Sequence, residues 1–334
     1  MKIAITGVAG FLGSHLADEY LAKGHEIVGI DNLIGGYRSN VPEGVDFREI
    51  DLLSLDDTRI ALREVEIVVH AACTAYEGLS VFSPSLVVAN TMQATTNVMS
   101  ASAFNKVHKV IFMSSMARYG TQARLPFTED MRPEPQDPYG IAKFGSEMIV
   151  RNVAEVHGLK YVILVPHNII GSRQKYDDPY RNVASIMINR MLQGKQPIIY
   201  GDGEQRRCFS FINDVIDPLS VATFSSTAES RIINIGPDEE FVTINTLAKE
   251  IASILDFKLD PIYMAGRPQE VVDANCSADL ARDLLGYETK VKLREGLTEL
   301  ANWIIASGAK SFDYHLPLEI ITDATPKTWR EKIM

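Results

Sequence analysis

The chain has few cysteines, no long apolar run and no excess of basic residues, and each shortage excludes a class of protein. Only 3 cysteines occur in 334 residues, which predicts reduced thiols in a cytoplasmic protein and argues against a disulfide framework. No apolar run is long enough to span a membrane, and the chain starts in a strand-like segment, so we expect neither a membrane span nor a signal peptide. A net charge of −10 would repel nucleic acid and anionic membrane surfaces. The 7 histidines show no paired ligand spacing, and we expect no metal.

Strand-like and helix-like segments alternate over the first half of the chain. Apolar runs of strand length lie at 2–6, 26–30, 67–72, 110–113 and 161–165, another strand is expected to close at Asp51-Leu52, and helical patterns cover 11–23, 90–104 and 139–157. Such alternation predicts an α/β fold with a doubly wound parallel (Rossmann) sheet. We assign residues 1–165 to a dinucleotide-binding domain. Residues 166–334 are expected to form a smaller substrate-binding region, with some segments returning to the sheet.

A glycine-rich loop follows the first strand. Gly7, Gly10 and Gly13 stand between that strand and the first helix, where they allow a tight turn, a close approach to phosphate and close helix packing. The N–H groups and the dipole of the helix would face an anion. The first gap is wider than in the usual Gly-x-Gly-x-x-Gly pattern, and a glycine-rich turn without a ligand is the alternative.

An acidic residue ends the second strand. Asp31 can accept hydrogen bonds from an adenosine ribose and would repel a 2′-phosphate, which favours NAD over NADP. A capping role is the alternative. Asp51 and Leu52 are expected near the adenine, and Ala71 and Ala72 leave room for the cofactor.

Ser115, Tyr139 and Lys143 carry the predicted chemistry. A spacing of four places Tyr139 and Lys143 on one helix face. A free tyrosine has a pKa near 10, and a nearby ammonium would stabilise its phenolate. Ser115 could hydrogen-bond the same substrate oxygen. A solvated helix face with an unrelated loop serine is the alternative; with the glycine loop, the set instead predicts a nicotinamide enzyme acting on an alcohol or ketone.

To about residue 305 the chain resembles the extended short-chain dehydrogenase/reductase family, the nucleotide-sugar epimerases and dehydratases. The motifs that carry the resemblance are Thr6-Gly7-x-x-Gly10-Phe11-x-Gly13, Asp31-Asn32, Asp51-Leu52, His70-Ala71-Ala72, Asn90, Ser114-Ser115, Tyr119-Gly120, Tyr139-x-x-x-Lys143, Asn168-Ile169-Ile170-Gly171, 201–207, Arg267-Pro268-Gln269-Glu270 and 284–287. The resemblance implies a tightly held NAD, a nucleoside-diphosphate sugar as substrate and a homodimer.

The resemblance also implies which residues bind each ligand. For the cofactor these are Gly7, Gly10, Phe11, Leu12, Gly13, Asp31, Asn32, Asp51, Leu52, Ala71, Ala72, Asn90, Ser114, Tyr139, Lys143, Pro166 and His167. For the substrate they are Ser115, Tyr139, Asn168, Asn182, Ile199, Tyr200, Arg207, Arg267 and Glu270. The two arginines would pair with the diphosphate, which suits forked guanidinium groups. Glu270 would hold the nucleoside ribose.

Two departures from the family pattern narrow the reaction. Dehydratases of the family carry an Asp-Glu pair directly after the catalytic hydroxyl residue, and decarboxylases carry a Glu two residues after it; here Met116 and Ala117 stand there. This leaves 4-epimerisation, most simply of a UDP-hexose. A 4,6-dehydratase, a 4-dehydrogenase or reductase, and a non-catalytic NAD-binding regulator remain the alternatives. The tail 310–334 extends past the usual family end and is interpreted as a packed tail, with an interface or lid as the other reading.

Overall fold

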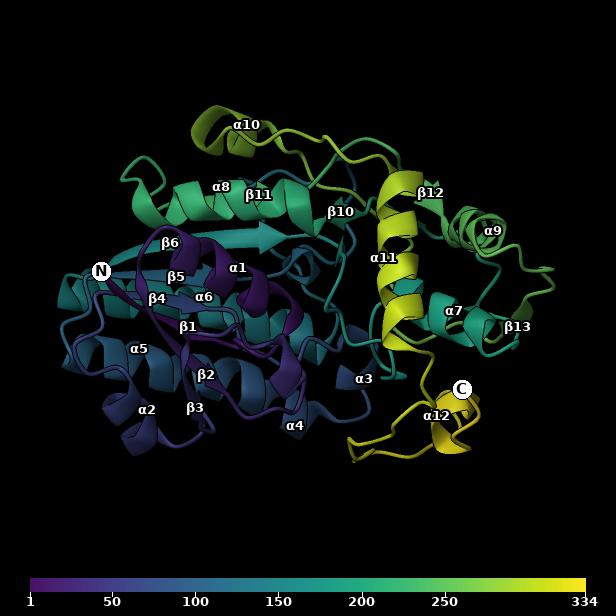
Figure 1. Ribbon diagram of the computed structural model, residues 1–334, viewed down its shortest axis with the longest axis horizontal. Helices are drawn as coiled ribbons and strands as arrows, with labels where there is room; N and C mark the ends of the chain where they lie inside the picture. The colour runs from purple at the N-terminus through teal and green to yellow at the C-terminus, as the bar shows by residue number, and fades with distance from the viewer.

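A parallel sheet of seven strands forms the larger part of the protein in the computed structural model, which describes residues 1–334 (Figure 1). Its strand order is β3-β2-β1-β4-β5-β6-β11, and every neighbouring pair is parallel. The strands are β1 (Lys2–Thr6), β2 (Glu26–Asp31), β3 (Asp46–Glu49), β4 (Ile67–His70), β5 (Lys109–Met113), β6 (Lys160–Pro166) and β11 (Ile232–Ile235). The order reverses between β1 and β4, which confirms the predicted doubly wound sheet.

Helices cover both faces of this sheet because its strands are apolar on both sides. One face packs against α1 (Phe11–Ala22), α8 (Ile212–Phe224) and α10 (Asp279–Leu285) around 23 buried apolar residues. The other packs against α2 (Leu55–Ala61), α5 (Ala94–Phe104) and α6 (Pro138–His157) around 26. Figure 1 shows α8 and α2 on opposite sides of the sheet.

Short elements connect the main ones. They are η1 (Arg38–Asn40), α3 (Glu77–Ser80), α4 (Pro84–Val88), η2 (Ala89–Gln93) and η3 (Met116–Arg118). The strand expected to close at Asp51-Leu52 ends at Glu49 instead. Asp51 starts a turn, in which its carboxylate accepts from the Leu53 amide at 2.9 Å and its carbonyl from the Ser54 amide at 3.0 Å. The fourth strand likewise ends at His70, two residues before the predicted end.

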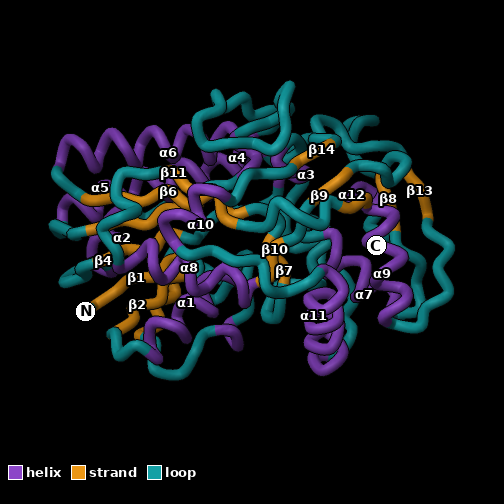
Figure 2. Tube along the Cα trace, turned by 90° about the horizontal axis from the view of Figure 1, so that it is seen from above, coloured by secondary structure: helices purple, strands orange, loops and turns teal.

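A smaller region lies beside the carboxyl ends of the strands (Figures 1 and 2). Three helices, α7 (Val183–Leu192), α9 (Ile244–Ile254) and α11 (Leu293–Ser307), pack around a third cluster of 19 buried apolar residues. Its short strands are β7 (Ile169–Ile170), β8 (Ile198–Tyr200), β9 (Arg206–Arg207), β10 (Ser210–Phe211), β12 (Val242–Thr243), β13 (Ile262–Met264) and β14 (Asp273–Ala274). The second half of the chain thus supplies this region, and also β11, α8 and α10 of the sheet layer. The domain boundary at residue 165 remains a prediction.

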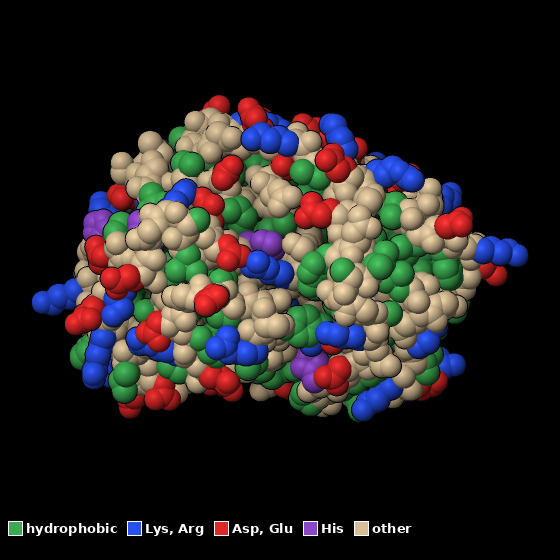
Figure 3. All heavy atoms as spheres, viewed as in Figure 1, with side chains coloured by type: hydrophobic (Ala, Val, Ile, Leu, Met, Phe, Trp, Pro, Cys, Tyr) green, Lys and Arg blue, Asp and Glu red, His purple; other side chains and the backbone are tan.

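The chain after α11, residues 308–334, is called here the C-terminal segment. It contains α12 (Lys327–Arg330) and ends beside the smaller region (Figure 2). Two of its side chains, Leu316 and Trp329, join a separate apolar cluster with residues of both halves of the chain. None of the helices is long and apolar enough to cross a membrane. Acidic and basic side chains are interspersed over the face that Figure 3 shows.

Candidate functional site

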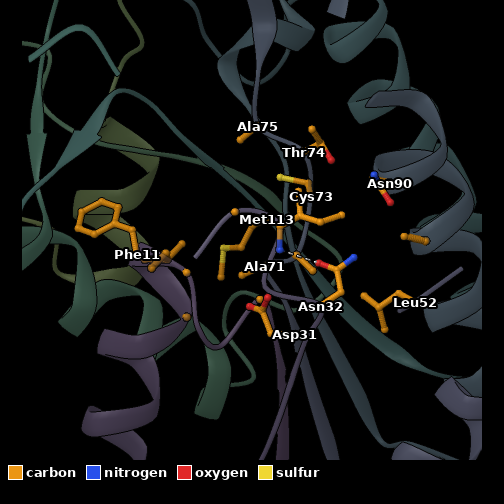
Figure 4. Close-up of a pocket in the computed structure, with 18 of the residues that line it drawn as sticks. Phe11, Asp31, Asn32, Leu52, Ala71, Cys73, Thr74, Ala75, Asn90 and Met113 are labelled. Atoms are coloured by element: carbon orange, nitrogen blue, oxygen red, sulfur yellow. Dashed lines mark hydrogen bonds between the residues drawn. The ribbon is translucent and has the colours of Figure 1, made fainter. Parts of the chain in front are cut away.

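A cavity opens at the carboxyl ends of β1, β2, β4 and β5, where the strand order reverses. Sixteen of the seventeen predicted cofactor residues line it. Figure 4 shows Asp31 and Asn32 on one side of the cavity, Cys73 and Thr74 on the facing loop after β4, and Phe11 and Asn90 at its two ends. The exception is His167, whose ring is fully buried and bonds the Pro237 carbonyl at 2.7 Å. A doubly wound sheet binds its ligand at this place.

The glycine loop leaves no room for side chains. A Cβ on Gly13 would lie 2.2 Å from the Gly7 carbonyl oxygen, and Gly7 itself has a φ of +75°. No side chain caps the N-terminus of α1, which begins after Gly10. The first amides of that helix are therefore free to bind an anion such as a pyrophosphate.

Asp31 is held in place by backbone amides. Its two carboxylate oxygens accept from the amides of Ala9 at 2.9 Å and Leu33 at 2.7 Å. Burial raises the pKa of Asp31, while these amides and Arg181 oppose the rise. A carboxylate with two oxygens has lone pairs left for ribose hydroxyls. The free amides of α1 and this carboxylate fit the two ends of an adenosine pyrophosphate.

Arg181 also lines the cavity, and sequence analysis missed it. It belongs to the chain between β7 and α7, and its guanidinium donates to the Gly35 carbonyl at 2.7 Å. It lies 4.6 Å from the ring centre of Tyr76. Arg181 and Lys143 are the two cations among the residues that line the cavity. In a chain of net charge −10 they supply the local positive charge for the diphosphate of a cofactor bound there. Arg181 belongs to no sequence motif of the cofactor site. It reaches the cavity only through the fold of the chain.

The three predicted catalytic residues come from two neighbouring elements. Ser115 caps η3, directly after β5, and Tyr139 and Lys143 lie in the first two turns of α6. That helix starts sharply because Pro138 occupies its first position and Asp137 accepts from the Gly140 amide at 3.0 Å.

Lys143 is fixed beneath Tyr139. Its ammonium donates to the Met113 carbonyl at 2.7 Å and lies 5.8 Å from the centre of the Tyr139 ring. Both side chains are buried. Burial raises the pKa of Tyr139 well above its usual value, the neighbouring Cys73 adds to the rise, and the Ser115 hydroxyl opposes it. A phenolate in this place therefore needs nearby positive charge.

Two carboxylates near Tyr139 were also missed. Glu77, in α3, has its pKa raised to about 7 by desolvation and by Asp137, with Arg207 and Arg267 acting in the opposite direction. Asp137 accepts hydrogen bonds from the Gly140 amide of α6 at 3.0 Å and from the Ser80 hydroxyl at 3.1 Å. Glu77 precedes Tyr139 by about 60 residues in the chain, and its sequence context gives no sign of this proximity.

Arg118, in η3, has a structural partner. Its guanidinium forms an ion pair with Glu147 of α6 at 2.9 Å, and both side chains are almost fully buried. Ser114 donates to the same carboxylate. This buried network connects η3 to α6 and so holds Ser115 and Tyr139 in a fixed relation.

Most of the predicted substrate residues lie outside the cofactor cavity, in the smaller region. Arg267 pairs with Glu270 at 2.8 Å and lies 5.0 Å from the ring centre of Tyr200. Arg207 donates to the backbone carbonyls of Val271 and Val272. Asn182 caps α7, and Asn168 donates to the Cys208 carbonyl at 3.0 Å. The charges of Arg207, Arg267 and Glu270 act on Glu77, and the charge of Glu77 in turn acts on Tyr139.

Comparison with known proteins shows the family of the chain. Residues 3–236 match the NAD dependent epimerase/dehydratase family. A putative UDP-glucose 4-epimerase of Methanocaldococcus jannaschii is 31% identical, with 90% of this chain and 98% of that protein covered. A UDP-N-acetyl-alpha-D-glucosaminuronate decarboxylase of Bacillus cytotoxicus is 28% identical, with 90% and 97% covered.

Solved structures are similar over almost the same part of the chain. The UDP-glucose 4-epimerase of Thermotoga maritima with UDP-glucose has a TM-score of 0.86 at 31% identity, covering 92% of this chain and 99% of its own. The Thermus thermophilus UDP-glucose 4-epimerase complexed with NAD also has a TM-score of 0.86, at 29% identity, covering 92% and 100%.

The chain belongs to the NAD dependent epimerase/dehydratase family, which confirms the resemblance found in the sequence. It is an enzyme, and its cofactor is NAD. The residues that would hold NAD are those of the cavity: the amides of α1 for the pyrophosphate and Asp31 for the adenosine ribose.

Proposed function

We propose that the protein is a nucleotide-sugar 4-epimerase that acts on a UDP-hexose. The observation that carries the proposal is the pair Met116 and Ala117 after Ser115, neither of which can move a proton. The nearby Glu147 is engaged by Arg118 and Ser114. Epimerisation at C4 needs only the serine, tyrosine and lysine together with NAD, and Ser115, Tyr139 and Lys143 supply the three side chains. The UDP-glucose 4-epimerases among the similar proteins support the choice of substrate.

In the proposed reaction, Tyr139 as phenolate accepts the proton of the C4 hydroxyl. NAD, when bound, supplies a hydride acceptor and donor for C4. Ser115 donates a hydrogen bond to the same oxygen. The Lys143 ammonium, 5.8 Å from the centre of the Tyr139 ring, stabilises the phenolate. The 4-keto sugar then turns in the site and is reduced on its other face, with Tyr139 returning the proton.

The test is to incubate the purified protein with UDP-glucose in heavy water and to follow the sugar by NMR. We expect the C4 epimer, no 6-deoxy-4-keto sugar, no net NADH and no need for added nicotinamide. C5 should stay unexchanged. A stable keto sugar or stoichiometric NADH would mean that the protein is a dehydratase or a dehydrogenase and not an epimerase.

Glu77 favours a second candidate. A carboxylate with a pKa near 7, close to Tyr139, has the properties of a general base and could remove a proton from C5. Such an exchange would belong to a 4,6-dehydratase. Deuterium at C5 that is lost in Glu77→Gln would support this candidate against simple epimerisation. The homodimer implied by the family resemblance also remains a proposal.

A further inference from the structure

The C-terminal segment connects the two halves of the molecule across the substrate side of the site. On the side of the sheet, the Glu319 carboxylate accepts from the amides of Ser85 and Leu86 at the start of α4, at 2.9 and 2.8 Å. On the side of the smaller region, the Trp329 indole donates to the Pro179 carbonyl at 3.3 Å. The similar solved structures cover 92% of this chain, which leaves a share about as long as this segment.

The end of the segment lies against the residues expected to bind the substrate diphosphate. The Thr328 hydroxyl forms a hydrogen bond with the hydroxyl of Tyr200. The Arg267 guanidinium lies over the Tyr200 ring, 5.0 Å from its centre. Trp329 and Arg267 meet at one point of α3: a Cβ on Gly78 would lie 3.1 Å from Arg267 Nη1 and 3.2 Å from Trp329 Cη2. Thr328 and Trp329 are almost completely buried there.

We infer that the C-terminal segment is a wall of the nucleotide-sugar site, in which Thr328 and Trp329 are positioning residues for Tyr200 and Arg267. The inference rests on the proposed function. Thr328 fixes the tyrosine ring against which the guanidinium packs, and Trp329 lies with the guanidinium against Gly78 of α3. The guanidinium is thus held ready for a diphosphate before the substrate arrives, which lowers the ordering cost of binding.

The test compares the full-length protein with Thr328→Val and Trp329→Ala. Thr328→Val removes one hydrogen bond at nearly constant volume, and we expect affinity for UDP to fall about fivefold, with a larger loss, about thirtyfold, for Trp329→Ala. The KM for UDP-glucose should rise by similar factors with kcat little changed, because these residues do not touch the reacting carbon. Bound NAD should stay constant, since neither residue lines the cofactor cavity. The matched control is Ile321→Ala, an exposed position of the same segment.

A double-mutant cycle separates positioning from general packing. If Thr328 acts through Tyr200, Thr328→Val combined with Tyr200→Phe should weaken UDP binding no more than Tyr200→Phe alone. Unchanged UDP affinity in both single variants, with only a lower melting temperature, would overturn the inference and leave the proposed function standing. If the wild-type protein binds no UDP in calorimetry, the proposed function fails and this inference with it.

Discussion

Lys143 is expected to set the pH at which Tyr139 can work. Its ammonium lies 5.8 Å from the tyrosine ring centre. If the phenolate charge is placed at the ring centre, two unit charges at this distance interact by about 3 kcal/mol at an effective dielectric constant of 20, which corresponds to about two pKa units. Lys143→Met removes the charge and keeps the length of the side chain. The pKa of Tyr139 should therefore rise by about two units, and the phenolate fraction at a fixed pH below it should fall about a hundredfold.

The assay is the pH dependence of epimerisation, with NAD occupancy measured in the same samples. Because activity needs the phenolate, the rate rises with pH until Tyr139 is ionised. In Lys143→Met this rising limb should move to higher pH by about two units, and the rate near pH 7 should fall by about two orders of magnitude. Arg151→Met, which removes an exposed cation from the same helix, is the control. A rising limb that stays in place while the rate falls uniformly would refute the electrostatic role.

Two further predictions concern the cofactor and the stability of the fold. Asp31→Ala should reduce the preference for NAD over NADP in titrations, because a 2′-phosphate would no longer meet a carboxylate; equal affinities in the wild type would contradict the assignment. Burial lowers the pKa of His70 to about 3, so the folded state resists its protonation, and stability should fall by about 1.4 kcal/mol per pH unit as pH drops below 6.5. His70→Gln should flatten this slope in denaturant titrations, and parallel slopes would exclude His70 as the cause.

The local parts of the site could be predicted from the sequence. The glycine loop, the strand end at Asp31 and the Tyr139–Lys143 pair each depend on a few consecutive residues, whose spacing determines their geometry within one strand, turn or helix. The doubly wound sheet could be predicted for the same reason, because buried parallel strands leave continuous apolar runs. Strand ends were less certain, since the turn at Asp51 depends on side-chain hydrogen bonds that hydrophobic periodicity does not reveal.

The surroundings of these parts were decided only by the tertiary structure. Arg181 reaches the cofactor cavity from the second half of the chain, and the charge of Glu77, in α3, acts on Tyr139. The C-terminal segment, which the sequence indicates to be a packed tail, an interface or a lid, lies with Trp329 against Gly78 about 250 residues earlier in the chain. Contacts of this kind depend on how separate elements pack, and packing is set by the shape and burial of whole surfaces. A single sequence therefore specifies the chemistry of Tyr139 and Lys143, while the fold decides which charged side chains and which packed segments surround them.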